Sequence, residues 1–207
     1  ADFAVEKDLF VVSDEIYEKL IYDGNKHYSI ASVSNYMKEN TIVVNGVSKT
    51  YSMTGWRIGY LAAPQEIATV ISKVQGHTTS NACSFAQYAT VTALSGGDDI
   101  VEEMRKSFDE RRKYMMSRFD AMGLSYIEPN GAFYMFVDIS KFIGKSVDGK
   151  VISGSMDFAS YLTDNGVAVI PGLPFHADGY IRLSYAVSMS DIEEGLTRIA
   201  KFIEKIA

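Results

Sequence analysis

Three short apolar runs in the first third of the chain place the strongest constraint on its fold. They cover residues 9–13, 42–44 and 58–63, and all are too short for a helix of ordinary length. Runs of this kind, rich in β-branched residues, are typical of strands buried on both faces, as in parallel sheets. We therefore predict three buried strands in this part of the chain, with Pro64 ending the third.

Helical periodicity begins directly after the third run. Apolar residues recur at helical spacing across residues 66–75, 84–94 and 98–122. Gly96 and Gly97 end the second of these segments, and Gly123 ends the third. The third segment is the longest, and we interpret the charges along it as a solvated face.

Shorter segments after Gly123 predict a second set of elements, with strands at 126–127, 132–139, 167–170 and 180–185 and helices at 155–165 and 192–206. Ser190 and Glu193 have the spacing of a capping box at the start of the last helix. Residues 144–149 carry two glycines and are the best candidate for a mobile loop.

The fold class that follows is α/β in two parts. Residues 1–95 carry the three buried strands with helices, and residues 123–207 form a smaller α+β domain. The long helix at residues 96–122 joins the two domains. The chain opens without a Met and in the middle of an amphipathic pattern, so we expect it to be a fragment of a larger protein.

Composition excludes several classes of protein. The 207 residues carry a net charge of −6, which argues against nucleic acid or an anionic membrane as the main partner. No apolar run approaches the roughly 18 residues of a membrane-spanning helix. The single cysteine cannot build a disulfide framework, which favours a reducing, cytoplasmic location.

Asp14 and Tyr17 are the first candidates for chemistry. Asp14 directly follows an apolar strand, and ligands of open α/β sheets bind at the carboxyl ends of strands. Tyr17 can reach the same side of the sheet. The alternative is an aspartate that caps the next turn beside a tyrosine that only packs.

The pair Ser48–Lys49 also follows an apolar strand. A lysine in such a cleft is desolvated, and its neutral amine can then attack a carbonyl to form a Schiff base. The alternative is a solvated surface lysine, which the small and apolar neighbours of Lys49 disfavour. Arg57, eight residues later, is suited to a phosphate or carboxylate.

Arg182 lies within a strand pattern between Ile181 and Leu183, where an arginine needs an anion. A structural ion pair is the alternative to a bound ligand. The three histidines, His27, His77 and His176, show no ligand spacing, so we predict no metal site. We interpret Cys83 as a small packing residue.

The order of "SDEIYE", "NGVSKTYSMTGWRIGY", "EPNGAFYMFVDIS" and "AVIPGLPFHADGYIRLSYA" resembles the class I/II aminotransferases that use pyridoxal 5'-phosphate (PLP), which have fold type I. The resemblance is nearest to the bacterial aspartate aminotransferase group and covers the whole chain. It corresponds to the C-terminal half of that family. The resemblance implies that residues 1–95 belong to the large PLP-binding domain.

The resemblance also implies a role for each candidate residue. Lys49 would form the Schiff base with PLP and carry the proton transfer, and Asp14 would pair with the pyridine nitrogen. Tyr17 would hydrogen-bond the 3-oxygen of the ring. Ser48 and Arg57 would hold the phosphate, and Arg182 would bind the α-carboxylate of the substrate.

The activity implied is transfer of an amino group from an L-amino acid, with aspartate as one candidate, to a 2-oxo acid by a homodimer. The resemblance leaves two other functions open, a PLP-binding sensor domain of a transcriptional regulator and a PLP-dependent lyase. The stretch "HTTSNACS" resembles a segment near the subunit interface of the family. Because the family's other half holds most of the phosphate cradle, we expect this chain alone to bind PLP weakly or not at all.

Overall fold

The computed structural model describes residues 1–206, which form two compact units, Ala1–Arg105 and a second that begins at Lys106. The division falls within the long helix α5 (Asp98–Ala121), so this helix contributes to both units. The predicted three-part division into 1–95, 96–122 and 123–207 stays a prediction.

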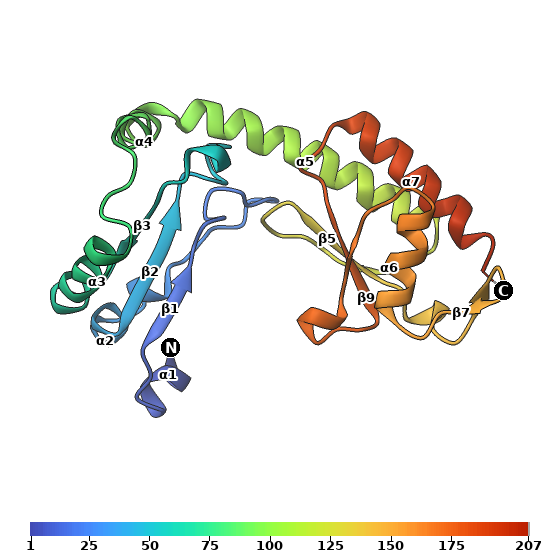
Figure 1. Cartoon of the computed structure of the whole chain (residues 1–207), viewed down its shortest axis with the longest axis horizontal. Coiled ribbons are helices and arrows are strands. Elements are labelled where there is room, and N and C mark those ends of the chain that lie inside the picture. Colours follow the sequence, from blue (N-terminus) through green and yellow to red (C-terminus); the bar gives the residue numbers. More distant parts are fainter. Residues whose placement is uncertain (207) are drawn as a thin grey trace. The chain divides into compact units, whose positions relative to one another are not determined.

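The first unit is built on a three-stranded sheet with the order β1–β2–β3 (Figure 1). Strand β1 (Val11–Asp14) pairs in parallel with β2 (Thr41–Gly46), and β2 pairs antiparallel with β3 (Gly59–Ala62). The three predicted strands are therefore confirmed. The helices of this unit are α1 (Asp2–Glu6), α2 (Asn35–Glu39), α3 (Gln65–Thr78) and α4 (Ser84–Gly96), with short 3-10 turns η1 (Ile30–Ser32) and η2 (Thr54–Trp56).

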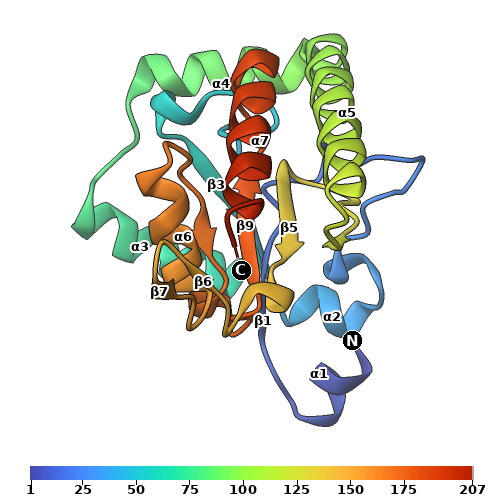
Figure 2. The ribbon, with the colours of Figure 1, turned by 90° about the vertical axis from the view of Figure 1, so that its right-hand side faces the viewer.

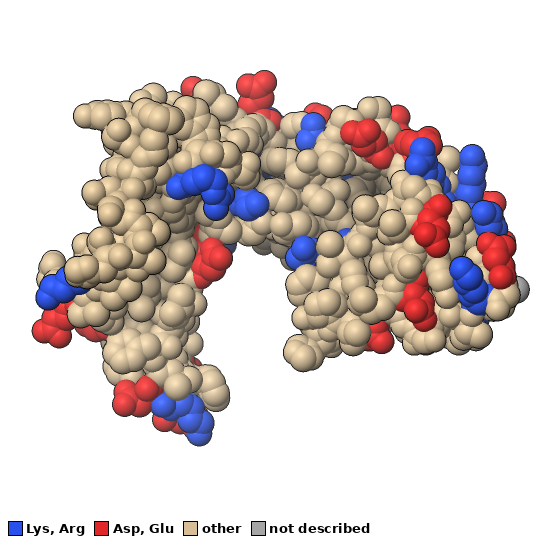
Figure 3. Space-filling view, in the orientation of Figure 1, with Lys and Arg blue, Asp and Glu red and all other residues tan. Residues whose placement is uncertain are grey.

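The prediction that these strands are buried on both faces is wrong for β1 and β3, whereas β2 is mostly buried or half-buried. Strand β1 alternates between half-buried and exposed residues, with Val12 68% exposed, and every residue of β3 is exposed. Among the residues described, nothing covers these side chains, although the composition of the strands is that of a covered sheet. Figure 3 shows the first unit as mostly tan, with few charged groups on the face drawn.

Strand β1 also forms an edge of this sheet. Its ladder hydrogen bonds on the other side are without a partner strand among residues 1–206. One core cluster of the first unit consists of Val47, Ile58 and Ala86, with Tyr51 and Met53 packed against them. Leu20, Tyr22 and Met37 are also fully buried in this unit.

The second unit contains a four-stranded antiparallel sheet with the order β4–β5–β9–β8. The strands are β4 (Tyr126–Ile127), β5 (Tyr134–Asp138), β9 (Tyr180–Ser184) and β8 (Ile170–Pro171). Helix α6 (Ser155–Asp164) lies against β8 and β9, and α7 (Met189–Ile203) is the last helix (Figure 2). Two further 3-10 turns are η3 (Ser140–Phe142) and η4 (Leu173–Phe175).

The sheet of the second unit has the alternation of an antiparallel sheet that is covered on one face. Met135, Val137, Ile181 and Leu183 are buried on one face, and Phe158, Leu162, Leu196 and Phe202 add to the same unit's core. The opposite face of β5 and β9 is half-buried.

Three sequence predictions for the second unit need correction. The strand predicted at 167–170 is reduced to β8, because Val167 instead closes the end of α6 by donating its amide to Leu162. Residues 144–149 lie in a hairpin of β6 (Ser146–Val147) and β7 (Lys150–Val151). The last helix is capped by Ser188 and not by Ser190, since the Ser188 hydroxyl accepts the amide of Asp191 at 3.1 Å.

The charges along α5 are not all solvated. Arg112 is only 1% exposed, pairs with Asp109 at 2.8 Å and donates to the Pro129 carbonyl at 3.0 Å. The Asp109 carboxylate and the Pro129 carbonyl therefore accept hydrogen bonds from the buried Arg112 guanidinium. The helical pattern alone would place this guanidinium in solvent. None of the described helices has the length and apolar character needed to cross a membrane.

Candidate active site

The carboxyl ends of β1 and β2 lie at the same edge of the sheet, because the two strands run parallel in the register Asp14 to Val44. Asp14 is the last residue of β1 and its side chain is exposed. One carboxylate oxygen accepts the amide of Ile16 at 3.1 Å. This bond fits the capping alternative, and it leaves the second carboxylate oxygen for another partner.

Lys49 follows the end of β2 in a turn that is tightly constrained. A side chain at Gly46 would lie 2.9 Å from the carbonyl oxygen of Ile58, so only glycine fits where β2 and β3 approach there. Val47 is fully buried, and its carbonyl accepts the amides of Tyr51 and Met53. These contacts fix the backbone that presents the half-buried Ser48 and Lys49.

Asn45 connects the turn after β1 to the end of β2. Its side-chain nitrogen donates to Glu18 at 2.9 Å, and its oxygen accepts the amide of Gly46 at 2.7 Å. Tyr17, directly before Glu18, is half-buried in the same turn. The Tyr17 turn and the Lys49 turn are therefore linked through a single amide side chain.

A buried carboxylate next to Asp14 was missed by the sequence reasoning. Glu15 is 6% exposed and accepts hydrogen bonds from the hydroxyls of Ser29 at 2.6 Å and Ser13 at 3.1 Å. Its other oxygen lies 2.8 Å from Nε2 of His27. Burial raises the pKa of Glu15, but the bonds with Ser29, His27 and Ser13 outweigh it and lower the pKa overall.

His27 thereby joins a group with the side-chain atoms that metals use. Ligand atoms of Glu15, Glu18 and His27 lie within 4.8 Å of one another. Each carboxylate already accepts a hydrogen bond, from Ser29 in one case and from Asn45 in the other. We interpret the group as a hydrogen-bond network, and the expectation of no metal site stays a prediction.

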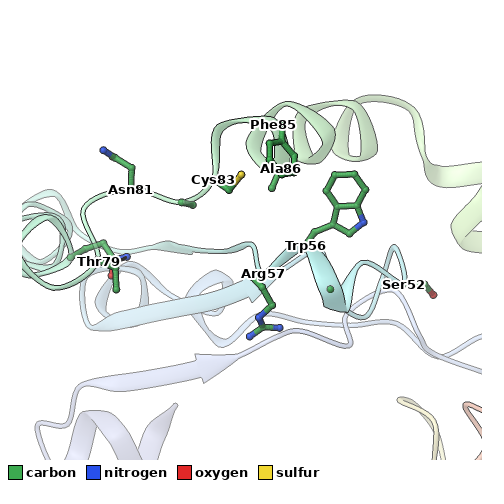
Figure 4. A pocket seen from close by; sticks show the side chains of 11 residues that line it. Ser52, Trp56, Arg57, Thr79, Asn81, Cys83, Phe85 and Ala86 are labelled. Carbon is green, nitrogen blue, oxygen red and sulfur yellow. Dashed lines mark hydrogen bonds between the residues drawn. The ribbon is translucent and has the colours of Figure 1, made fainter.

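Arg57 lines a cavity of about 740 Å³ in the first unit, together with Ser52, Gly55, Trp56, Gln75, Thr79, Asn81, Ala82, Cys83, Phe85 and Ala86. Figure 4 shows Arg57 extending away from α4, with Trp56 and Phe85 on facing elements. These two rings meet edge to face at 6.5 Å. Arg57 itself has a left-handed backbone, φ 58°, and donates to the Thr54 carbonyl at 2.9 Å.

The cavity brings "HTTSNACS" beside Arg57, which sequence reasoning did not foresee. Thr79, Asn81 and Cys83 lie on the segment between α3 and α4, more than twenty residues after Arg57. Cys83 is exposed and a free thiol, so the interpretation of a packing cysteine is wrong. The small residues of this segment were the only sequence signal available.

Arg182 lies in β9 of the second unit. It is half-buried, and among residues 1–206 it forms no ion pair and donates no side-chain hydrogen bond. Its guanidinium carbon lies 4.4 Å from the ring centre of Tyr134 and 4.7 Å from that of Phe175. The alternative of a structural ion pair therefore does not hold within the described chain.

The structure thus gathers Asp14, Tyr17, Ser48 and Lys49 on two linked turns at one sheet edge, with Arg57 on the cavity of the same unit. Arg182 belongs to the other unit. The roles of all six residues stay predictions. The donor set, an amine, a carboxylate, a phenol and a guanidinium, matches the groups that a phosphorylated, carbonyl-bearing pyridine needs.

Comparison with known proteins shows the family to which the chain is similar. The family model for aminotransferase class I and II matches residues 1–199. The chain is 45% identical to an aspartate aminotransferase of Bacillus sp. (strain YM-2), with 99% of this chain and 52% of the relative aligned. A probable N-acetyl-LL-diaminopimelate aminotransferase of Bacillus subtilis is 43% identical, with 96% of this chain and 48% of the relative aligned.

Solved structures give the same result. The aspartate aminotransferase of Rhizobium meliloti superposes with a TM-score of 0.94 at 38% identity, covering 99% of this chain and 52% of that one. The aromatic aminotransferase of Pyrococcus horikoshii has a TM-score of 0.88 at 42% identity, covering 98% and 53%. The chain spans about half the length of the relatives that it matches.

Proposed function

The chain belongs to the class I and II aminotransferases, and from this premise we propose that it carries the cofactor lysine of an enzyme that transfers an amino group from an L-amino acid to a 2-oxo acid. The observation that carries the proposal is the placement of Asp14 and Lys49 after two neighbouring parallel strands. Both lie at the carboxyl edge of the parallel pair β1–β2, where open α/β sheets bind their ligands.

The family implies PLP as the cofactor, and the residues present fit it. PLP supplies a carbonyl carbon that an amine can join and a pyridinium ring that accepts electrons. Lys49 would be the attachment point and would hold and move the proton at its Nζ. Asp14 would use its second carboxylate oxygen to keep a proton on the pyridine nitrogen.

Three further residues would orient the cofactor. Tyr17 would donate its hydroxyl proton to the 3-oxygen of the ring, and the Asn45–Glu18 bond would hold the turn that carries Tyr17. Arg57 would bind the phosphate as a charged fork from the cavity that it lines, with Ser48 as a second donor. The Thr54 bond uses one of the five Arg57 donors.

Arg182 would bind the α-carboxylate of the amino acid. Its support is the absence of any carboxylate partner for this strand arginine among the described residues. The in-plane N–H groups of a guanidinium between two rings are suited to a bidentate carboxylate. The side-chain preference of the substrate is open, because the similar proteins carry aspartate, aromatic and N-acetyl-LL-diaminopimelate names.

We also propose that the chain corresponds to the C-terminal half of the family fold and acts in the cytoplasm within a homodimer. The order of the Asp14, Lys49 and Arg182 motifs and the open edge at β1 support the first part. The single free cysteine, Cys83, supports the cytoplasmic location. The mass and oligomeric state of the native protein test these assignments.

Borohydride trapping tests the role of Lys49. The native protein is incubated with PLP and reduced, and its peptides are analysed by mass spectrometry. We expect one pyridoxyl group on the Lys49 peptide, and none in Lys49→Ala. The same experiment on residues 1–207 alone is expected to give little adduct. A modified lysine elsewhere, with Lys49 unmodified, would exclude this function.

Half-transamination then distinguishes an aminotransferase from a PLP-binding sensor domain and from a PLP-dependent lyase. With L-aspartate and without a 2-oxo acid, an aminotransferase converts its PLP to pyridoxamine phosphate, which is followed by absorbance. A sensor domain would bind PLP and leave it unconverted with every amino acid tried. A lyase would release a cleavage product of the amino acid while the cofactor stayed as PLP.

A further inference from the structure

The half-buried face of the β5–β9 ladder is mostly aromatic and carries two charged residues, Asp138 and Arg182. Tyr134 and Phe136 of β5 share this face with Tyr180 and Arg182 of β9, since side chains alternate along strands and Phe136 pairs directly with Arg182. The opposite face holds the buried Met135 and Val137. Arg182 therefore lies among rings on this face, and the Asp138 carboxylate, opposite Tyr180, accepts hydrogen bonds from Ser140.

Two rings contact the Arg182 guanidinium directly. Tyr134 comes from the neighbouring strand, and Phe175 comes from η4, seven residues before Arg182. Both ring centres lie well within the roughly 6 Å over which a ring face attracts a cation. We call Tyr134 and Phe175 the aromatic pair. No carboxylate or carbonyl competes with them for Arg182 among residues 1–206.

Other aromatic rings pack against both members of the aromatic pair. Phe175 meets Phe136 edge to face at 6.3 Å, and Phe136 stacks on Tyr180 at 4.8 Å. Tyr134 packs against Phe133 at 4.9 Å, and the Phe133 carbonyl accepts the amide of the fully buried Tyr185. Rings with neighbours of this kind have little freedom to move away from Arg182.

We propose that Tyr134 and Phe175 are positioning residues for Arg182, a role that rests on the carboxylate-binding function proposed above. A ring contacts the flat side of a guanidinium, so its in-plane N–H groups stay available for a bidentate carboxylate. By limiting rotation of the guanidinium, the aromatic pair lowers the entropy that binding must remove. A lysine at this position has no flat side to stack and no fork to orient.

Side-chain NMR of the whole chain tests this inference without cofactor or activity. The order parameter of the Arg182 Nε–Hε group is measured by ¹⁵N relaxation in the wild type, Tyr134→Leu, Phe175→Leu and Tyr180→Leu. We expect an ordered group in the wild type and clear loss of order in the first two variants. Tyr180→Leu is the matched control, because it removes a ring of the same face that has no contact with Arg182. The methyl signals of Val137 and Leu183 verify that each variant keeps its fold.

Sodium acetate, titrated against sodium chloride at equal ionic strength, is the carboxylate probe. Tyr134→Leu and Phe175→Leu should each weaken acetate binding at Arg182 roughly two- to fivefold, the equivalent of one exposed cation–π contact. Arg182→Lys should lose the response although it keeps the charge.

The NMR measurement tests the positioning inference, and the acetate titration tests the carboxylate role of Arg182. If neither aromatic variant changes the order of Arg182 in a folded chain, the inference is overturned whatever the function. If both variants release the guanidinium but acetate has no effect on the wild type, the positioning contacts are supported and the proposed carboxylate role of Arg182 fails.

Discussion

The two units of this chain bury their apolar residues to very different degrees. In the second unit, β5, β9, α6 and α7 enclose a continuous set of buried residues, with Phe158, Leu162 and Phe202 almost fully inaccessible. In the first unit, Val47, Ile58 and Ala86 form one small cluster and Leu20, Tyr22 and Met37 are fully buried, while large side chains along β1, α3 and α4 stay exposed.

The two units therefore differ in the interactions that stabilise them. The second unit can be stabilised by its own hydrophobic burial, whereas the first relies more on its ladders and hydrogen-bond networks. The candidate cofactor residues lie in the first unit, on turns held by Asn45, Glu15 and Gly46. Local polar contacts therefore hold the turns that carry the candidate cofactor residues.

The largest expected effect contrasts two phenylalanines. Phe158 is fully buried between Phe142 and Phe202, with ring centres at 5.6 and 5.3 Å. Phe158→Ala should reduce the free energy of unfolding of the second unit by about 3–5 kcal/mol. Phe85, 70% exposed in the first unit, is the matched control, and Phe85→Ala should cost no more than about 0.5 kcal/mol. Urea denaturation followed by circular dichroism measures both, and equal losses would contradict the contrast.

Two ion pairs on α5 allow the two units to be compared directly. Both have i, i+3 spacing, but they belong to different units. Asp109 pairs with the buried Arg112 in the second unit, and Asp109→Asn should cost about 3 kcal/mol by leaving a buried charge unpaired. Glu102 pairs with the more exposed Arg105 in the first unit, and Glu102→Gln should cost under about 1 kcal/mol. Thermal unfolding of the two variants in parallel tests the order.

Acid should weaken the first unit through Glu15. Its pKa is lowered on folding from the ordinary 4.5, so its contribution is complete above that value and is lost as the pH falls through the folded pKa. Glu15→Gln should remove about 2 kcal/mol at neutral pH and flatten this dependence. Trp56, the single tryptophan, reports the first unit by fluorescence. An unchanged acid midpoint in the variant would exclude Glu15 as the cause.

The lowered pKa of Asp109 makes the same prediction for the second unit. Burial raises this pKa, but the bonds from Lys113 and Arg112 lower it below the ordinary 3.8. Glu15→Gln should leave that acid response in place, which hydrogen exchange of the β5 and β9 amides can follow. A loss of both responses in the one variant would show that the units do not respond separately.

The smallest expected effect concerns the cap of α7. Ser188→Ala should cost about 1 kcal/mol, because it removes the acceptor for the Asp191 amide. Ser190→Ala is the control and should change stability little, although Ser190 is the residue that the sequence pattern favours. The stabilities of the two variants are compared by thermal unfolding. A larger loss of stability in Ser190→Ala would show that Ser190 is the capping residue.

Local patterns predicted most of the elements for physical reasons that operate within a few residues. Helical spacing located α3, α4, α5 and α7, and short apolar runs located the three strands of the first sheet. The capping serine of α7 was misplaced by two residues, since two serines with an acidic residue three positions on compete there. Burial was misjudged in both directions, at Val12 and at Arg112, because composition does not reveal what covers a side chain.

The candidate site was predicted in part for the same reason. Asp14 and Lys49 each follow an apolar strand, so the parallel pairing of those strands brings them to one edge. The partners of Glu15 lie up to fourteen residues away, and Tyr134 lies 48 residues before Arg182. No local pattern encodes such contacts.

The sequence by itself determined the order of the elements, the family and the chemical groups available at the strand ends, because these depend on residue type and short spacing. The contacts of Glu15 with Ser13, Ser29 and His27, and those of Arg182 with two aromatic rings, emerge only from the folded chain. Such contacts depend on which strands and turns become neighbours, and that follows from chain topology and packing.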